Sequence, residues 1–433
     1  MRKLLYILIF LFLSFSFDAD SPPLSGWYQQ FLPDINGASI NDITFTVSLN
    51  GYAVTNIGGS SSYMLKTSNG GDNWIVKFTH NQQFQRIIFI NSNTGFTNAF
   101  MKIFKTTNAG ENWSAIDLPG IFGDDMFVLN EDTIWLAEST STFGGIYRTT
   151  NGGLTWTIQF QYGGTNPDKI YMYDRNLGFM KRGTALFRTS NSGVNWTEIN
   201  SLGFKDIYFI DSLTGWKAWY YFFKTTDGGN TWVQKPLPPE GSFILISGIN
   251  NFSLVNEDIL WGVGAEAFYG SGKYRGMIYK STDGGESWGY QIPDTSINLG
   301  IYTFMKFINK LNGWSYSTIG GVHTVTGGGD TTIYVEMKPI STEIPGGYRL
   351  HQNYPNPFNY STRIKFDISK TSDVKLKVYN LLGKEIDEIV NSKISAGSYD
   401  FRFIGSELSS GVYFYRLSAD GNVVDTKKML LIK

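Results

Sequence analysis

This sequence contains no cysteine among its 433 residues. That absence excludes disulfides, thiolate-bound zinc, thiol catalysis and a lipidated N-terminal cysteine. Histidine is almost as scarce, and His80, His323 and His351 are too scattered for a metal-ligand pattern, so we expect no metal and no cofactor. The chain also lacks an excess of either charge, with 36 Lys+Arg against 37 Asp+Glu, which argues against nucleic acid or an anionic membrane as a partner.

Aromatic residues and glycine are abundant instead. The chain has 32 Phe, 25 Tyr and 12 Trp residues, and its 48 glycines are spread among them rather than gathered in one tract. Strand-forming aromatics interleaved with turn-forming glycines are typical of an all-β protein. We therefore predict an all-β fold.

The N-terminus reads as a secretory signal peptide, which we place at residues 1–18. Arg2 and Lys3 precede an apolar run from Leu4 to Phe17, and polar residues follow at once. The alternative is a membrane anchor, but this run of about 14 residues is shorter than the roughly 20 needed to span a bilayer. No A-x-A site marks the cleavage point, and no later segment is predicted to cross a membrane.

One motif, [ST]-x-[DN]-x-G-x-x-W, occurs six times and defines an internal repeat. Its acid or amide and its tryptophan fall at Asn69 and Trp74, Asn108 and Trp113, Asn151 and Trp156, Asn191 and Trp196, Asp227 and Trp232, and Asp283 and Trp288. A seventh copy, Thr324 to Thr331, keeps the hydroxyl and the glycines but has lost the acid or amide and the tryptophan. The period of roughly 40 residues is the length of one four-stranded propeller blade.

A second motif, an alternating strand followed by a turn and an aromatic residue, falls between the copies of the first motif, which we call boxes. Its aromatic residues are Tyr52, Phe96, Trp135, Phe179, Trp216, Trp261 and Trp314. Two independent motifs with the same count predict a seven-bladed β-propeller over residues 24–336. Because Trp27 resembles the tryptophan that the seventh box lacks, we also predict that the N-terminal strand completes the last blade.

Each residue type of the box has a local structural role. The Asp or Asn side chain can accept hydrogen bonds from the backbone of a tight turn, and the following glycine supplies a positive φ. The tryptophan can then bury a large apolar surface at the start of the next strand. We therefore interpret the six acids and amides as turn scaffold rather than as a set of catalytic groups.

These motifs resemble the Asp-box, or bacterial neuraminidase, repeat family. Segments such as Ile207 to Asp211, Gly215-Trp216 and Phe223 to Gly229 are most similar to the propellers of photosystem II stability/assembly factors, over about residues 27–335. The resemblance implies a propeller fold. It implies no particular activity, because the repeat occurs in sialidases, other glycosidases, receptors and non-catalytic assembly factors.

The pattern breaks after residue 336. We predict a linker at 337–347 and a small antiparallel β-sandwich, immunoglobulin-like, at 348–433. This last part resembles the type A C-terminal sorting domain of type IX secretion cargo, through the phrase that includes Tyr354, Pro355, Asn356, Pro357 and Phe358 and a basic-apolar end with Lys427 and Lys428. The resemblance implies the type IX machinery as a partner, and release or surface attachment outside a Gram-negative cell. The alternative is an ordinary accessory or carbohydrate-binding module.

Catalytic residues are not predicted. A sialidase needs three arginines on its substrate carboxylate, and the propeller has only six, two of which occupy the lysine position before a box. Other Asp-box glycosidases need two carboxylates across a cleft, for which Asp124, Asp125, Asp168 and Asp294 are the candidates, although each is also an ordinary solvated loop residue. A secreted glycoside hydrolase, sialidase-like or xyloglucanase-like, therefore stays as the alternative function.

The favoured function is non-catalytic binding of a protein or glycan by a monomer. Three loops between second and third strands are longer than the others, and long loops on a rigid scaffold often carry function. We predict ligand binding through Tyr63, Phe268, Tyr269, Tyr274 and Arg275, since binding sites commonly combine aromatic side chains with a few polar groups. The alternative is that these aromatics only tether their loops.

Overall fold

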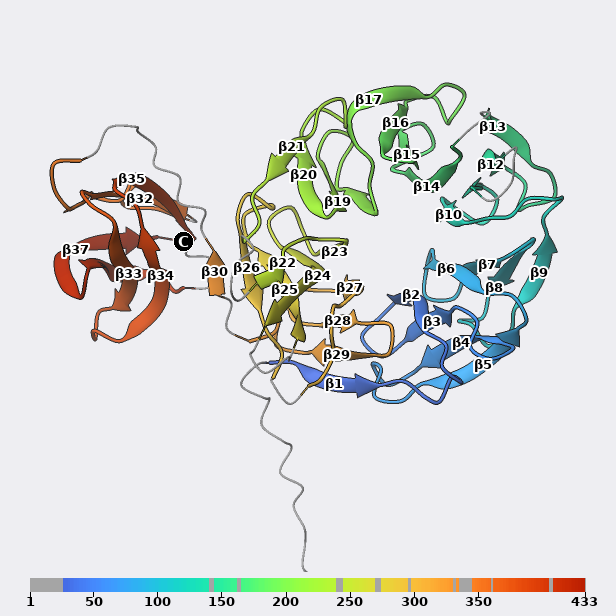
Figure 1. Cartoon of the computed structure of the whole chain (residues 1–433), viewed down its shortest axis with the longest axis horizontal. Helices are drawn as coiled ribbons and strands as arrows, with labels where there is room; N and C mark the ends of the chain where they lie inside the picture. Colours follow the sequence, from blue (N-terminus) through green and yellow to red (C-terminus); the bar gives the residue numbers. More distant parts are fainter. Residues whose placement is uncertain are drawn as a thin grey trace, which may run out of the picture.

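The computed structural model describes residues 26–139, 144–161, 165–238, 244–268, 274–294, 297–329, 332–334, 345–359, 361–404 and 408–432. Every regular element in these ranges is a β-strand, and they contain no helix that could span a membrane. The predicted signal peptide and most of the predicted linker lie outside the described residues. Figure 1 shows one group of sheets arranged around a ring and a second, smaller group beside it.

Seven sheets form the ring among the described residues. Sheets 1 to 5 each consist of four consecutive antiparallel strands. Sheet 1 contains β2 (Ile40–Phe45), β3 (Gly51–Thr55), β4 (Ser62–Thr67) and β5 (Ile75–His80), and sheet 2 contains β6 (Phe84–Phe89), β7 (Gly95–Ala99), β8 (Lys102–Thr106) and β9 (Ser114–Asp117). Sheet 3 contains β10 (Asp125–Val128), β11 (Ile134–Ala137), β12 (Gly145–Thr149) and β13 (Thr157–Gln161). Sheet 4 contains β14 (Pro167–Met172), β15 (Gly178–Arg182), β16 (Ala185–Thr189) and β17 (Thr197–Leu202), and sheet 5 contains β18 (Asp206–Phe209), β19 (Gly215–Trp219), β20 (Tyr221–Thr225) and β21 (Val233–Lys235).

Sheet 6 departs from this pattern. Its inner strand is split into β22 (Ile244–Ile246) and β23 (Asn251–Leu254), which both pair with the long β24 (Leu260–Phe268). β24 and β25 (Tyr274–Ser281) form an extended hairpin, followed by β26 (Trp288–Gln291). The outer edge of β26 is covered by β30 (Thr332–Tyr334), a strand from the far end of the propeller sequence.

Sheet 7 joins the two ends of the ring. It contains β27 (Phe304–Phe307), β28 (Gly313–Tyr316), β29 (Gly320–Thr324) and the N-terminal strand β1 (Tyr28–Phe31). β1 pairs antiparallel with β29, from Tyr28 opposite His323 to Phe31 opposite Gly320 (Figure 1). The prediction that the N-terminal strand completes the last blade is therefore confirmed.

The repeated boxes share one hydrogen-bond pattern. In sheet 1, Thr67 Oγ1 accepts from the Gly71 N–H at 3.0 Å and Asn69 Oδ1 accepts from the Asn73 N–H at 3.0 Å. The equivalent bonds recur in the next five boxes, and in the seventh Thr324 Oγ1 still accepts from the Gly328 N–H at 2.7 Å. Hydroxyl oxygens and the carboxamide or carboxylate oxygens of Asn and Asp thus satisfy turn amides that water would otherwise have to reach.

Each box turn is also bonded to the first hairpin of its own sheet. Gly70 N–H donates to the Leu49 carbonyl at 2.8 Å in sheet 1, and a matching bond occurs in every other sheet of the ring, down to Gly327 with Leu311 in sheet 7. The boxes and the turns between first and second strands therefore lie on one face of the ring, which we call the box face. The opposite face, here the link face, carries the hairpins between second and third strands and the links between sheets.

The second motif supplies the core between sheets. Its seven aromatic side chains, from Tyr52 to Trp314, are all at most 1% exposed. The aromatic residue of one sheet packs against its neighbour, as where Trp314 of sheet 7 stacks on Phe45 of sheet 1 with ring centroids 3.9 Å apart. Full burial of such large rings makes each sheet depend on the next for its stability.

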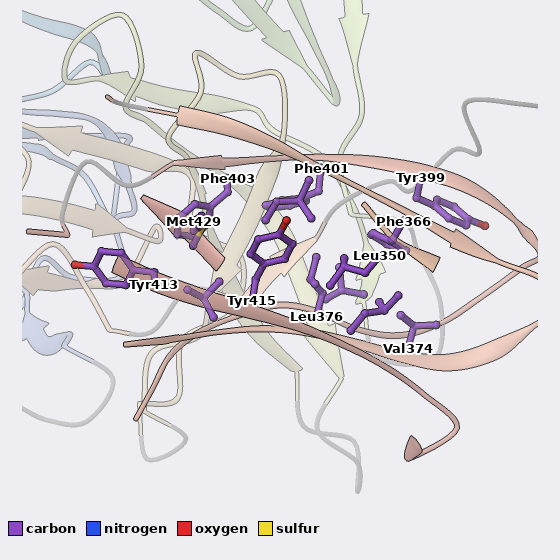
Figure 2. Packing of buried hydrophobic residues seen from close by; sticks show 14 of the residues in the cluster. Leu350, Phe366, Val374, Leu376, Tyr399, Phe401, Phe403, Tyr413, Tyr415 and Met429 are labelled. Carbon is purple, nitrogen blue, oxygen red and sulfur yellow. The ribbon is translucent and has the colours of Figure 1, made fainter. Parts of the chain in front are cut away.

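The C-terminal group consists of two antiparallel sheets around one core. One sheet contains β31 (Arg349–Leu350), β32 (Ser361–Ile368) and β35 (Gly397–Ile404). The other contains β33 (Ser372–Asn380), β34 (Glu385–Ile394), β36 (Gly411–Ala419) and β37 (Asn422–Leu431). Figure 2 shows side chains of both sheets, including Phe366, Leu376 and Tyr415, pointing into the same apolar layer. These strands pack as a sandwich because apolar residues alternate along them, as in β33.

Candidate functional site

A cavity of about 330 Å³ lies where the inner strands of all seven sheets meet. It is lined by β2, β6, β10, β14, β18, β23 and β27, so it is the central channel of the ring. Each inner strand contributes one channel-lining residue at an equivalent position. It stands two residues before the one that pairs with the buried aromatic of the second strand. These seven residues, which we call the channel ring, are Asp42, Arg86, Asp125, Lys169, Asp206, Asn251 and Phe304.

The acids and the amide of the channel ring connect neighbouring sheets. Asp42 Oδ2 accepts from the Ile87 N–H at 2.9 Å, and Asp125 Oδ2 accepts from the Ile170 N–H at 3.0 Å. The same bond joins Asp206 to Phe252 at 2.9 Å and Asn251 to Met305 at 2.6 Å. Each side chain therefore caps an inner-strand amide of the following sheet, which is a structural use of a carboxylate.

The two cations of the channel ring stand between the acids. Arg86 Nε lies 3.2 Å from Asp42 Oδ2 and 3.4 Å from Asp125 Oδ1, and Lys169 Nζ lies 3.7 Å from the same Asp125 oxygen. Burial lowers the pKa of Arg86, but the neighbouring carboxylates Asp42, Asp125 and Asp206 outweigh it, so the net pKa is raised. The guanidinium is thus held charged at the centre of the ring.

Burial also shifts the pKa of two of these acids. It raises the pKa of Asp42 above its ordinary value, and it raises the pKa of Asp206 to about 6, against the opposing effects of the Phe252 N–H and Arg86. In the unfolded chain a carboxyl of this type ionises near pH 4. Between about pH 4 and pH 6 the folded protein therefore binds more protons at Asp206 than the unfolded chain does.

We accordingly predict that Asp206→Asn flattens the pH dependence of stability in this window. In the unmodified protein the Asp206 contribution to the free energy of unfolding falls by about 2 kcal/mol as the pH rises from about 4 to 6, because ionising the buried carboxyl is costly. Urea unfolding at steps of pH should show this decline and its loss in Asp206→Asn. Identical pH profiles for the two proteins would contradict the prediction.

The sequence-predicted binding residues come from two places: Tyr63 from β4 of sheet 1, and Phe268, Tyr274 and Arg275 from the β24–β25 hairpin of sheet 6. Tyr63 is 8% exposed in the core of sheet 1, where its hydroxyl accepts from Asn36 Nδ2 at 2.5 Å. Arg275 is also 8% exposed and donates through Nη1 to Asn298 Oδ1. Phe268 and Tyr274 do meet, with ring centroids 5.5 Å apart at the end of the β24–β25 hairpin, while Tyr269 lies outside the described residues.

The four candidate acids have separate partners. Asp125 is the one that lines the channel. Asp124 Oδ2 accepts from Ser139 N–H and Oγ–H at 2.5 and 2.9 Å, and Asp168 Oδ2 lies 2.5 Å from Lys181 Nζ. The Asp294 carbonyl accepts from the Ile297 N–H at 2.9 Å. Within the described ranges, no three acids or histidines gather closely enough to hold a metal ion.

Two family models match different parts of this chain. A family model described as "Photosynthesis system II assembly factor YCF48" matches residues 24–166, and one described as "Secretion system C-terminal sorting domain" matches residues 352–433. The chain is 23% identical to the chloroplastic photosystem II stability/assembly factor HCF136 of Arabidopsis thaliana over 337 residues, which cover 67% of this chain and 77% of the relative. The chain resembles the photosystem II assembly factors.

Two solved structures carry the same likeness. "YCF48 bound to D1 peptide" superposes with a TM-score of 0.51 at 18% identity, covering 70% of this chain and 97% of that one. YCF48 from Cyanidioschyzon merolae gives a TM-score of 0.51 at 17% identity, covering 69% and 98%. At this identity the likeness concerns the fold, and it shows that the ring is a β-propeller.

The C-terminal match concerns export. A domain of this type marks cargo of the type IX secretion system, so the chain is secreted to the outside or the surface of a Gram-negative cell. The secretion machinery is therefore a partner of this chain.

The channel ring was missed by the sequence interpretation, although a signal for it exists. Each of its members stands ten residues before the buried aromatic of its sheet, at 42 and 52, 86 and 96, 125 and 135, 169 and 179, 206 and 216, 251 and 261, and 304 and 314. Aligning the seven inner strands at this constant offset places acid, base, acid, base, acid, amide and phenyl side by side. Read singly, the same residues look like ordinary polar positions at strand starts.

Proposed function

We propose that this chain is a secreted binding protein without catalytic activity, whose propeller takes an extended segment of another protein at the link face and the channel. The observation that carries this proposal is the use of the channel carboxylates. Asp42, Asp125 and Asp206 each accept a hydrogen bond from a backbone amide of the next sheet. A carboxylate held in that way is poorly suited to exchange protons with a glycosidic oxygen or to attack a sugar.

The finer architecture belongs to the same proposal. We take the seven sheets as seven Asp-box blades over residues 24–336, followed by a linker at 337–347 and an immunoglobulin-like sorting domain at 348–433. The ring closes within one chain through β1 and β29, which supports a monomer. A signal peptide at residues 1–18 fits a chain that carries a sorting domain.

The proposed contact surface is the link face near sheet 6. The β24–β25 hairpin begins at the box face with Leu260 opposite Ser281, so its other end, with Phe268 opposite Tyr274, lies on the link face. Tyr274 is 46% exposed there. A paired aromatic edge on a projecting hairpin is a suitable anchor for a protein segment. A structural relative named as bound to a peptide makes a peptide the first ligand to test.

The test uses the purified full chain and three kinds of probe. Extended synthetic peptides and a glycan array report binding, and sialyl and xyloglucan substrates report hydrolysis. We expect saturable peptide binding, no sugar release, and weakening by about tenfold when Phe268 and Tyr274 are both changed to Ser. The matched control is Tyr354→Ser, which removes an 81% exposed tyrosine from the C-terminal group of sheets.

The alternative, a secreted glycoside hydrolase, predicts the opposite result. Reducing sugar would appear with a polysaccharide substrate, and an acid variant such as Asp206→Asn would abolish it. Sugar release of that kind would overturn the proposed function, as would failure of every peptide to bind.

A further inference from the structure

Two lysines face the central channel without an ion pair to any carboxylate of the described residues. Lys205, directly before β18, and Lys306, within β27, both line the cavity and are exposed to it. Within the described part of the chain, neither ammonium group makes a hydrogen bond or an ion pair. Burial lowers the pKa of both lysines, so each charge is held where solvation is already incomplete. At Lys306 the negative charge of Asp206 opposes this lowering without reversing it.

Their surroundings favour an anion. After burial, the next influences that lower the pKa of Lys205 are the positive charges of Lys169 and Lys181. Lys169 and Lys181 have carboxylate partners in Asp125 and Asp168, at 3.7 and 2.5 Å, so Lys205 is the uncompensated member of the group. The charged residues that line the cavity are four cations, Arg86, Lys169, Lys205 and Lys306, and three acids, Asp42, Asp125 and Asp206, a difference of one positive charge.

The two lysines stand at different depths. Lys205 directly precedes β18 and so lies toward the link face. β18 runs from the link face to the box face, where the turn that follows it accepts a hydrogen bond from the box of its own sheet. Lys306 lies further along the channel, two positions beyond the channel ring, opposite Trp314 in its own sheet. A ligand that reaches both must be extended along the channel axis.

We propose that the channel binds the carboxylates of an acidic, extended peptide segment, with Lys205 and Lys306 as two separate anion-binding positions. This inference rests on the proposed function and specifies its ligand. A carboxylate fits better than a phosphate dianion, because Asp42, Asp125 and Asp206 repel a second negative charge in the same cavity. A lysine ammonium, unlike an arginine fork, suits a single carboxylate oxygen. The cavity of about 330 Å³ is at the small end of ligand sites, which suits a few residues rather than a folded domain.

Fluorescence anisotropy on the full chain tests this inference. The probes are three labelled, acetylated and amidated peptides in which glycine alternates with Glu, with Gln or with Lys. We expect the Glu peptide to bind best and to lose affinity as salt is raised. Lys205→Met and Lys306→Met should each weaken its binding by about tenfold, and the double variant more. Thermal unfolding of each variant checks that it is folded.

The control is Lys384→Met, which removes the same charge at an exposed turn of the C-terminal group of sheets. It should bind the Glu peptide as the unmodified chain does. If the Glu and Gln peptides bind equally well, the proposed function stands and the carboxylate inference fails. If free glutarate binds as tightly as the Glu peptide, the site takes a small dicarboxylate and the peptide ligand is overturned. If no peptide binds, both proposals fail.

Discussion

Trp27→Ala is expected to lower the free energy of unfolding by about 3–5 kcal/mol, the usual cost of emptying a buried tryptophan site. Trp27 is fully buried, and its Nε1–H donates to Gln291 Oε1 at 2.8 Å. Its ring meets Trp261 of sheet 6 and Phe307 of sheet 7 edge-on, with centroids 6.1 Å away in both cases. The residue therefore ties the N-terminal strand to two sheets encoded near the other end of the propeller.

Urea unfolding followed by circular dichroism measures this loss. Phe31→Ala is the matched control, since Phe31 ends the same strand but is 67% exposed, and it should change stability by less than about 0.5 kcal/mol. Similar small losses in both variants would mean that ring closure does not depend on the buried indole.

Asp125→Ala should be almost as costly, about 3–5 kcal/mol, because it removes one member of a buried charge cluster. Asp125 is 2% exposed. Its loss leaves the Ile170 N–H without its acceptor, and it leaves Arg86 and Lys169 without the carboxylate that lies 3.4 and 3.7 Å away. Both the desolvated amide and the desolvated cations contribute to the expected loss.

Two controls separate these contributions. Asp125→Asn keeps an oxygen for the Ile170 N–H but removes the charge, so its loss should be intermediate. Asp124→Ala changes the neighbouring acid, whose carboxylate accepts its hydrogen bonds from Ser139 in a loop, and should cost about 1 kcal/mol or less. Equal stability of Asp124→Ala and Asp125→Ala, measured by urea unfolding, would show that the channel acids do not connect the sheets.

The ring was predictable because its information is local and repeated. Each box needs only a hydroxyl, an acid or amide and a glycine to form its turn, so the pattern predicted where hairpins fall. The missing tryptophan of the seventh box and the spare Trp27 together predicted the closure that β1 makes with β29. The split inner strand of sheet 6 and the added strand β30 were not predicted, since both depend on pairing between segments that the repeat does not encode.

The channel was not predictable in the same way. The sequence predicts Tyr63 and Arg275 as binding residues because they lie in or beside long loops, and the structure adds that their side chains are hydrogen-bonded to Asn36 and Asn298. Lys205 and Lys306 had no motif around them. Their relation arises only when strands about a hundred residues apart line one cavity. Their place in that cavity without an ion pair then distinguishes them from Lys169, which has one.

The pairing of β30 with β26 sets a condition on any cleavage that would remove the sorting domain after export. A protease that cuts beyond Tyr334 leaves β30 in place, and the outer edge of sheet 6 stays paired. A cut before Thr332 would strip that edge and expose the backbone of Trp288 to Tyr290, which is a template for edge-to-edge aggregation. The solubility of a product that lacks the sorting domain would therefore depend on whether the cut falls before or after Thr332–Tyr334.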